Sequence, residues 1–379
     1  MKHCLRKFAP VVSLSAFVML NACRKADVPP AVATNPPTIS SPVTLDLIPA
    51  QNQNPGDRRV YLPITRIGST AMNLITVFDS GSEGLVLQGS AVFPAQYIAD
   101  TGMVINSADS AIINGITVTS TKVVSVYGDP PATRSFYGNI AYAQVTFGDQ
   151  NGSIQSERMP FVVIYKGIDN QTQDTVPLDA SSNGIAGVYS TGFDPSVTLV
   201  TTRAGVKSPF NYFNYTGGLD AGIATAPFSQ VGWTNTPSNT GFPATRLLTV
   251  GLTSDMEAGY AFQSQLLDAG NAFDPDVVGS FTYNGTTLSN SLILFDTGTP
   301  VGYTLYNGSA GGSSTLASGT SVQLTTQSGF SYAYTADNAL FQTTVTSTGQ
   351  QRCILGIDFF LNNSLLLDYT MHYIGLKGS

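Results

Sequence analysis

Two copies of one short motif lie far apart in this chain. The run 74–82, Leu-Ile-Thr-Val-Phe-Asp-Ser-Gly-Ser, has a close counterpart at 291–299, Ser-Leu-Ile-Leu-Phe-Asp-Thr-Gly-Thr. Each copy is a hydrophobic strand that runs into Asp-(Ser/Thr)-Gly-(Ser/Thr), which places a carboxylate on a tight turn. The two aspartates, Asp79 and Asp296, are 217 residues apart (296 − 79), which is too far for one hairpin. We therefore expect two similar lobes that bring the carboxylates together.

Beyond residue 57, the chain is organised as short strands separated by turns. Runs rich in Val, Ile, Thr, Tyr and Phe dominate, and stretches with a helical period are scarce. Short helices are predicted near 195–204 and 357–362. Turns are predicted at four Asn-Gly pairs, which are 114–115, 151–152, 284–285 and 307–308. The predicted fold class is therefore all-β, apart from a few short helices.

The charge of the chain excludes one class of partner. Lys and Arg together number 17 and Asp and Glu together number 24, which gives a formal net charge of −7. A protein that binds nucleic acid needs a basic surface to contact the phosphates. We therefore expect no nucleic-acid partner.

Few residues are available for metal or nucleophilic chemistry. The sequence has two histidines, His3 and His372, and three cysteines, Cys4, Cys23 and Cys353. Metal centres and nucleophile–base sites need several such side chains to converge, so we expect neither a metal site nor a cofactor. We interpret His372 as a surface residue and Cys353 as a small buried side chain.

Two aspartates that face each other across a lobe interface suggest one type of chemistry. Like charges a few ångströms apart repel, so the pair shares a proton at acidic pH. One carboxylate can then act as a general base on a water molecule while the other protonates a peptide carbonyl. A single Asp-Ser-Gly-Ser is most often a β-turn, but two copies in the same context favour the catalytic interpretation.

The N-terminus has the order of an export signal. Three basic residues lie within the first seven, residues 8–20 are apolar, and Leu-Asn-Ala-Cys ends at Cys23. A transmembrane helix is the alternative, but about 13 apolar residues are too few to cross a bilayer. The segment resembles a bacterial lipoprotein signal, which implies cleavage before Cys23 and acylation of that cysteine. By the same resemblance, Arg24 implies sorting to the outer membrane of the cell envelope, on its periplasmic or surface face.

Four segments of the chain are predicted. Residues 1–22 are the lipoprotein signal peptide. Residues 23–57, rich in Pro, Ala, Asn and Thr, are predicted to be a lipid-anchored extended tether that cannot bury enough surface to fold. Residues 58–212 are predicted to form an N-terminal lobe with the first motif, and residues 213–379 a C-terminal lobe with the second.

Most of the chain beyond residue 57 resembles the pepsin-like, bilobal (A1-type) aspartic peptidases. The run 61–79, from Tyr-Leu-Pro-Ile to the first Phe-Asp, looks like the approach to that family's first catalytic motif. The run 279–299 looks like the approach to its second, and Ile-Leu-Gly at 354–356 is similar to its closing signature. The resemblance implies two β lobes of the six-stranded type with a cleft between them.

The resemblance also implies roles for individual residues. Asp79 and Asp296 would form the catalytic dyad, and the hydroxyl and glycine residues beside them would support it. By position in the two motifs, the supporting residues are Ser80, Gly81, Ser82, Thr297, Gly298 and Thr299. The first hydroxyl of each motif would bond across the base of the lobes, and the second would donate to the outer carboxylate oxygen. The glycines would leave backbone room beside the carboxylates.

A hairpin that covers the cleft is a further feature of the family. Tyr127-Gly128, followed by the strand 138–148, looks like that flap, although Tyr127 could equally be an ordinary half-buried strand tyrosine. The chain departs from the family pattern at two places. Val86 stands where most members have a Trp that hydrogen-bonds the flap tyrosine, and Glu83 replaces a small or polar residue beside the first motif.

Three functions remain open from the sequence. The first is an aspartic endopeptidase, tethered to the bacterial cell envelope, that hydrolyses peptide bonds by means of a water molecule activated by two aspartates. The second is an inactive pepsin-fold lipoprotein that binds peptide or glycan in the cleft, and the third is a structural surface lipoprotein. The partners expected for the enzyme are an extended peptide or protein substrate and the membrane, contacted through the N-terminal lipid alone. We expect a monomer.

Overall fold

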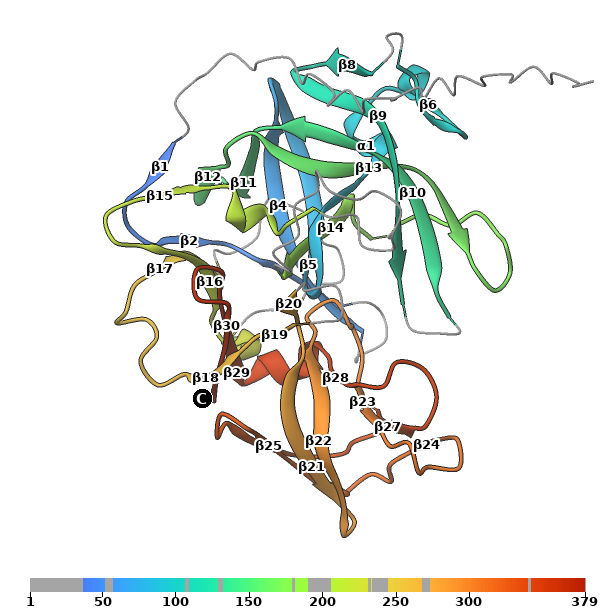
Figure 1. The fold of residues 1–379 in the computed structure, drawn as a ribbon, viewed down its shortest axis with the longest axis vertical. Helices are drawn as coiled ribbons and strands as arrows, with labels where there is room; N and C mark the ends of the chain where they lie inside the picture. The colour runs from blue at the N-terminus through green and yellow to red at the C-terminus, as the bar shows by residue number, and fades with distance from the viewer. Residues whose placement is uncertain are drawn as a thin grey trace, which may run out of the picture. The chain divides into compact units, whose positions relative to one another are not determined.

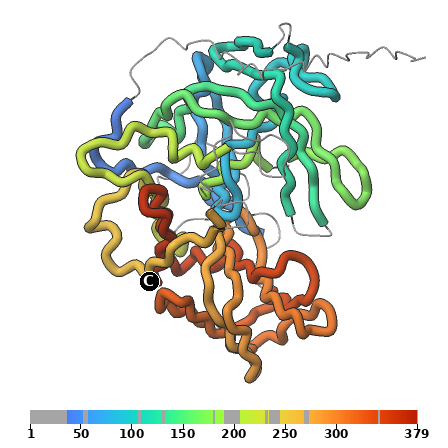
Figure 2. Tube along the Cα trace, viewed as in Figure 1, coloured from blue at the N-terminus to red at the C-terminus, as the bar shows by residue number. Residues whose placement is uncertain are grey.

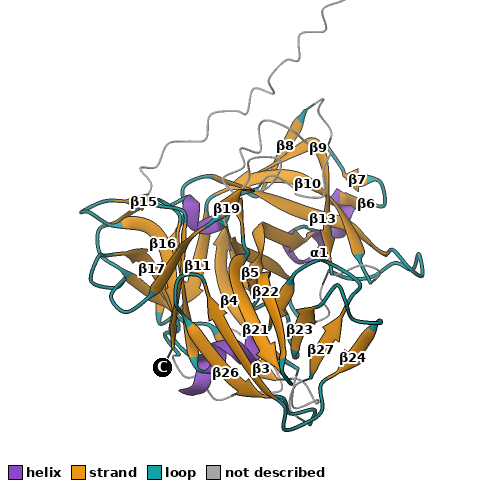
Figure 3. Ribbon diagram, turned by 60° about the horizontal axis from the view of Figure 1, so that its bottom comes forward, coloured by secondary structure: helices purple, strands orange, loops and turns teal. Residues whose placement is uncertain are grey.

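Strands account for most of the structure, with a few short helical turns between them (Figure 3). The computed structural model describes residues 37–51, 57–105, 109–128, 132–178, 181–189, 206–230, 233, 245–267, 273–339 and 342–378. The predicted signal peptide, Cys23 and the helix predicted near 195–204 lie outside the described residues. The described residues belong to one compact unit, Ala33–Ser379. Within them, the helical turns are too short to span a membrane.

The first lobe is built on a ten-stranded sheet, drawn in blue and green in Figure 1. Strands β4 and β5 form its central antiparallel pair, and β14 lies parallel to β5. The strands are β3 (Ile48–Gln51), β4 (Arg58–Ile67), β5 (Thr70–Gln88), β8 (Ser110–Ile113), β9 (Ile116–Tyr127), β10 (Arg134–Ala143), β11 (Val145–Asp149), β12 (Gly152–Gln155), β13 (Met159–Asp169) and β14 (Gly184–Tyr189). The first motif lies within β5.

The second lobe is built on an eight-stranded sheet, drawn in orange and red below the first lobe in Figure 2. Strand β28 lies parallel to β22, as β14 does to β5 in the first lobe. The strands are β21 (Val277–Tyr283), β22 (Thr286–Phe295), β23 (Tyr303–Tyr306), β24 (Ser313–Thr315), β25 (Ser321–Thr326), β26 (Ser331–Thr335), β27 (Thr343–Thr346) and β28 (Cys353–Leu355). Strand β22 ends at Phe295, immediately before Asp296 of the second motif.

A six-stranded sheet connects the start of the chain with its second half. Strand β2 pairs with β17, about 200 residues further on, in the register Val43↔Val250. The strands are β2 (Val43–Leu45), β16 (Asp220–Thr225), β17 (Leu248–Leu252), β18 (Ala261–Ser264), β29 (Asn363–Asp368) and β30 (Tyr373–Gly378). The predicted all-β, two-lobed fold is confirmed, but the lobe sheets have ten and eight strands, and the six-stranded sheet is the one that connects distant parts of the chain.

The prediction of an extended tether as far as residue 57 is wrong for residues 38–51. Leu45 and Leu47 in this segment are completely buried, and Ile48 is nearly so. Strand β2 pairs with β17 in the six-stranded sheet, and β3 pairs with β4 in the first lobe. The proline content suggested a solvated chain, but apolar side chains close together supply enough burial to hold the segment against the folded unit.

The remaining elements are short. Two-stranded pairs are formed by β1 (Thr38–Ile39) with β15 (Asn214–Tyr215), by β6 (Ile98–Ala99) with β7 (Gly102–Met103), and by β19 (Leu266–Leu267) with β20 (Phe273–Asp274). The helical turns are α1 (Gly89–Val92), η1 (Ala95–Tyr97), η2 (Pro209–Asn211), η3 (Phe228–Gln230) and η4 (Ile357–Leu361). The helix predicted near 357–362 is therefore confirmed, as the 3-10 helix η4.

Three of the four predicted Asn-Gly turns join neighbouring antiparallel strands. At 114–115 and 284–285 both residues have positive φ, between 48° and 77°, which is the backbone of a type I′ hairpin turn. The pair 151–152 joins β11 to β12. The pair 307–308 forms a turn in the loop between β23 and β24, where the N–H of Ala310 donates to the carbonyl of Asn307 at 2.9 Å, so this turn is confirmed although it does not join paired strands.

The core runs beneath the two motifs in both lobes. Phe78, which precedes the first aspartate, and Phe295, which precedes the second, belong to the same buried cluster. The ring of Phe295 lies 4.6 Å from that of Phe359 on η4, centroid to centroid. A smaller buried cluster, which includes Val77, lies in the first lobe. Each aspartate thus directly follows a phenylalanine that is anchored in the core.

Candidate active site

Each aspartate of the repeated motif is held between a strand and its parallel neighbour. In the first lobe, Asp79 lies in β5 beside Gly187 of β14. In the second lobe, the backbone N–H of Asp296 donates to the carbonyl of Leu355 in β28 at 2.9 Å. Strands β14 and β28 therefore flank the two aspartates in equivalent ways.

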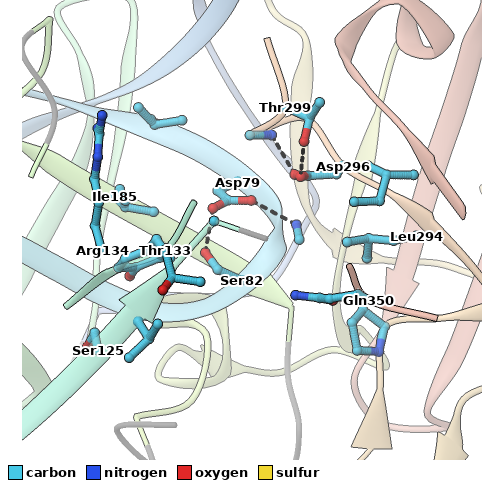
Figure 4. A pocket seen from close by; sticks show the side chains of 18 of the residues that line it. Asp79, Ser82, Ser125, Thr133, Arg134, Ile185, Leu294, Asp296, Thr299 and Gln350 are labelled. Carbon is cyan, nitrogen blue, oxygen red and sulfur yellow. Dashed lines mark hydrogen bonds between the residues drawn. The ribbon is translucent and has the colours of Figure 1, made fainter. Parts of the chain in front are cut away.

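The two carboxylates receive matching hydrogen bonds within their own turns (Figure 4). The backbone N–H of Gly81 donates to Oδ1 of Asp79 at 2.8 Å, and the hydroxyl of Ser82 donates to Oδ2 at 2.6 Å. For Asp296 the corresponding donors are the N–H of Gly298 at 2.7 Å and the hydroxyl of Thr299 at 2.6 Å. The two turns are equivalent in the chemistry that they offer each carboxylate.

Reciprocal hydrogen bonds lock the bases of the two turns together. The backbone N–H of Ser80 donates to the hydroxyl of Thr297 at 3.0 Å, and the N–H of Thr297 donates to the hydroxyl of Ser80 at 2.9 Å. Each hydroxyl then donates to the opposite lobe, Ser80 to the carbonyl of Phe295 and Thr297 to the carbonyl of Phe78, both at 2.7 Å. Four buried hydrogen bonds thus fix the two lobes in register directly below the aspartates.

The glycines of the motifs allow the carboxylates to face each other closely. A Cβ placed on Gly81 would lie 2.6 Å from the Oδ1 atom of Asp296, and a Cβ on Gly298 would lie 2.5 Å from the Oδ1 atom of Asp79. Each glycine therefore contacts the carboxylate of the opposite lobe while its N–H binds the carboxylate of its own. A side chain at either position would occupy space that the dyad needs.

Burial and the facing charge raise the pKa of Asp79. Its side chain is 7% exposed, and removal from water disfavours the ionised form. The charge of Asp296 raises the pKa further, while the hydrogen bonds from Ser82 and Gly81 lower it in part. The two carboxylates therefore hold one proton in common to a higher pH than an isolated aspartic acid would, and this proton belongs to the pair.

The Asp79→Asn variant is expected to be more resistant to heat than the wild type at neutral pH. The pKa of Asp79 is raised on folding, to about 8, from about 4 in the unfolded chain. The wild type therefore has its full stability below about pH 4 and loses part of it as the pH rises towards the pKa of the folded state. An amide does not ionise and avoids this loss. The melting temperatures of the variant and the wild type should diverge as the pH rises between the unfolded and the folded pKa of Asp79. A difference that stays constant with pH would contradict the prediction.

Both aspartates line a cleft of about 1160 Å³ that is formed by both lobes. Apolar side chains cover much of its walls, while polar groups cluster around the dyad. The apolar lining includes Val77, Val126, Phe136, Val176, Leu178 and Ile185 from the first lobe, with Leu292, Leu294 and Ile354 from the second. A cleft of this size can hold several residues of an extended peptide.

The predicted flap is a hairpin formed by β9 and β10, and its tip at 129–131 lies outside the described residues. Tyr127 and Gly128 line the cleft, and the ring of Tyr127 packs edge-on against Phe136 with centroids 5.8 Å apart. Burial raises the pKa of Tyr127, and the charges of Asp79 and Glu83 raise it further. Tyr127 is therefore close enough to Asp79 for the two side chains to interact electrostatically.

Both departures from the family pattern lie beside the flap. Val86 is 2% exposed and apolar, so position 86 offers no hydrogen-bond donor to the hydroxyl of Tyr127. Val86 and Tyr127 belong to the same apolar cluster instead. Glu83 lines the cleft next to the first motif and adds a carboxylate to its wall. The side chain of Tyr127 is thus held by packing.

Charged residues that the sequence did not single out also line the cleft. No motif or spacing marks them, because each reaches the cleft through a contact between distant segments. They are Arg59, the ion pair of Arg134 with Asp169 at 3.8 Å, and the ion pair of Arg352 with Asp276 at 3.5 Å. In the part of the chain that the structure describes, no group of three His, Cys, Asp or Glu residues is arranged to hold a metal ion.

The remaining histidine and cysteine lie away from the cleft lining. Cys353 is completely buried and accepts a hydrogen bond from the N–H of Tyr306, and burial raises the pKa of its thiol to about 11. His372 stacks on Phe273 with ring centroids 3.8 Å apart and is half-buried. The interpretation of Cys353 as a small buried side chain is confirmed. His372, interpreted as a surface residue, is only partly exposed.

Comparison with known proteins shows the fold. No protein-family model and no curated protein sequence matches the chain. The structure of an aspartic proteinase from Irpex lacteus is similar over 89% of this chain and 98% of its own, with a TM-score of 0.56 and 18% identity. The structure of Basic 7S globulin from soybean is similar over 88% of this chain and 96% of its own, with a TM-score of 0.51 and 12% identity. The chain therefore has the fold of the pepsin-like aspartic proteinases.

Proposed function

We propose that the protein is an aspartic endopeptidase that hydrolyses peptide bonds with a water molecule activated by Asp79 and Asp296. The observation that carries this proposal is the matched set of donors on two facing carboxylates, one from each lobe. Such an arrangement is costly unless the pair shares a proton. A shared proton is what general acid–base hydrolysis by two carboxylates requires.

The chemistry follows from the singly protonated pair. The ionised carboxylate removes a proton from water, whose oxygen attacks the peptide carbonyl, while the protonated carboxylic acid gives its proton to the carbonyl oxygen. A tetrahedral diol results, and the dyad keeps one proton. As the C–N bond breaks, one carboxyl group protonates the leaving nitrogen and the other takes a proton from the diol, which leaves a new carboxylic acid and a free amine.

The cleft supports an extended peptide as the substrate. Its apolar walls offer surface for the side chains of a peptide, and Tyr127 of the hairpin lines the same cleft as the first aspartate. An extended main chain also exposes its N–H and C=O groups to the edges of the cleft. Because both aspartates come from one chain, we propose that the protein works as a monomer.

Cleavage by a soluble form that begins after Cys23 tests this function. The form is incubated with an unfolded protein across roughly pH 3 to 7, the range in which a shared proton on two carboxylates titrates. We expect cleavage that a statine-type inhibitor blocks and that declines on the alkaline side, where the pair loses its proton. A well-folded protein that cleaves nothing at any pH, or activity that is insensitive to the inhibitor, would contradict the assignment.

A second candidate is a binding protein that holds peptide or glycan in the cleft without cleaving it. Two observations favour it. Position 86 gives the flap tyrosine no hydrogen bond, and one protein of similar fold bears the name of a globulin. The intact pair of aspartates argues against it, since a binding protein would relieve their repulsion by losing one. Calorimetry with peptides and glycans is the corresponding test if cleavage fails.

We also propose that the protein is anchored to the bacterial cell envelope by a lipid on Cys23, on the outer membrane. The support is the sequence alone, in which a basic start and an apolar run lead to Leu-Asn-Ala-Cys. Residues 24–37, ahead of the first buried strands, would then be the tether between lipid and folded unit.

The Cys23→Ser variant is expected to lose membrane attachment. Without the thiol there is no site for acylation, and a chain without lipid has no means of stable anchoring. Fractionation of cells after expression should place the wild type with the membranes and the variant in the soluble fraction or as uncleaved precursor. A Cys353→Ser variant is the matched control, and it should fractionate with the wild type. A membrane-bound, processed Cys23→Ser protein would exclude the lipid anchor.

A further inference from the structure

Two successive arginines of the first lobe hold the turn that carries the second aspartate. Arg59, near the start of β4, donates from its Nη1 atom to the carbonyl oxygen of Gly298. The backbone N–H of Arg58 donates to the carbonyl of Pro300 at 3.1 Å. The side chain of Arg58 forms an ion pair with the buried Asp358 on η4 at 2.7 Å. The second catalytic turn is thus bound from the opposite lobe at two of its carbonyls.

The peptide group of Gly298 is in contact with both carboxylates of the dyad. Its N–H donates to Asp296 at 2.7 Å, and its Cα lies so close to Asp79 that a Cβ would be 2.5 Å from the Oδ1 atom. A small rotation of this residue would therefore move one carboxylate and crowd the other. A guanidinium group suits the task of fixing the turn, because it is planar and permanently charged.

The second turn needs such a support more than the first does. In the first lobe, β5 continues through the whole motif, and Gly187 of β14 pairs with both Asp79 and Gly84. In the second lobe, β22 ends at Phe295 and the motif continues as a turn outside any strand. Among the described residues, no side chain donates to the carbonyl of Gly81 as Arg59 does to that of Gly298.

We propose that Arg59 is a positioning residue for the second catalytic turn. Its guanidinium holds the carbonyl of Gly298 so that the N–H of the same residue stays directed at Asp296. The carboxylate then stays in the plane in which it can share a proton with Asp79. This inference rests on the proposed peptidase function for its kinetic consequence, but the orientation of the turn can be measured without it.

The first measurement compares the kinetics of Arg59→Gln, Arg59→Lys and Arg66→Gln variants. Arg66 is the matched control, because it lies on the same strand, is exposed and donates to the nearby carbonyl of Ser69. We expect Arg59→Gln to lower kcat by about tenfold to a hundredfold, with KM within about twofold, since misplacement of a reacting group affects the chemical step. Arg59→Lys, which keeps a cationic donor, should recover part of the loss. Equal kcat values in all three variants would overturn the proposal.

The second measurement is amide hydrogen exchange at the two catalytic turns, and it does not depend on activity. Loss of Arg59 should speed exchange of the N–H groups of Gly298 and Thr299, while the N–H of Gly81 serves as an internal reference. Faster exchange at the second turn alone supports the proposal even if the wild type cleaves nothing, in which case the peptidase function fails separately. Unchanged exchange at the second turn, or equal acceleration at both turns, would refute it.

Discussion

The Asp79→Asn and Asp296→Asn variants are each expected to lose peptide-bond cleavage by about a thousandfold or more. An amide can neither take the proton from water nor hold the shared proton, yet it has the shape of the carboxyl group. The N–H of Gly81 and the hydroxyl of Ser82 can still bind an Asn at position 79, because an amide has one acceptor and one donor. The kcat/KM for an unfolded protein or a labelled peptide is the measurement.

A matched control separates loss of chemistry from loss of charge in the cleft. Asp169 also lines the cleft, but it pairs with the exposed Arg134 at 3.8 Å, and such surface pairs contribute little. Asp169→Asn should therefore stay within about twofold of the wild type. The double variant at both dyad positions should be no worse than either single one, because residues that act as a unit are not additive. A dyad variant that keeps a tenth of the activity would exclude the two-aspartate mechanism.

The Gly298→Ala variant is expected to lose about a hundredfold or more in kcat, even though both aspartates remain. The new methyl group would lie 2.5 Å from the Oδ1 atom of Asp79 and 3.0 Å from that of Asp296. The carboxylates must move apart, and Asp79 then loses the donors on Gly81 and Ser82 that hold it. Such crowding also costs about 1 to 3 kcal/mol of stability, so both kcat and melting temperature should be measured.

Gly311→Ala is the control for this substitution. Gly311 has open space around its Cα and no positive φ, so a methyl group is accommodated there. Its kcat and melting temperature should match those of the wild type. If Gly298→Ala melted normally and kept full activity, the close approach of the two turns would not be required for catalysis.

The two aspartate turns could be predicted from the sequence because local chemistry determines them. A carboxylate, a hydroxyl and a glycine at fixed spacing after a buried strand allow few arrangements. The same arrangement twice in one chain indicates that the two copies meet. The hairpin turn at Asn284-Gly285 was predictable for a similar reason, since that pair favours positive φ.

Contacts between distant segments could not be predicted in this way. The composition of the segment with Leu45 and Leu47 predicts a solvated tether, because its partner strand, β17, lies about 200 residues further along the chain. Arg59 looks like an ordinary charged residue near the start of a strand, and its contact with Gly298 depends on how the two lobes meet. Composition describes a segment by itself, whereas burial depends on what the rest of the chain places beside it.

The pairing of β2 with β17 also has a consequence for how the protein is made. The residues Val43 and Val250 lie side by side in one sheet but leave the ribosome 207 residues apart (250 − 43), an interval of about 10 to 40 s at typical rates of synthesis. During that time β2 lacks its neighbour in the six-stranded sheet, and the first aspartate lacks its counterpart. A growing chain therefore carries only half of the aspartate pair, on which the proposed peptidase function depends, until synthesis is nearly complete.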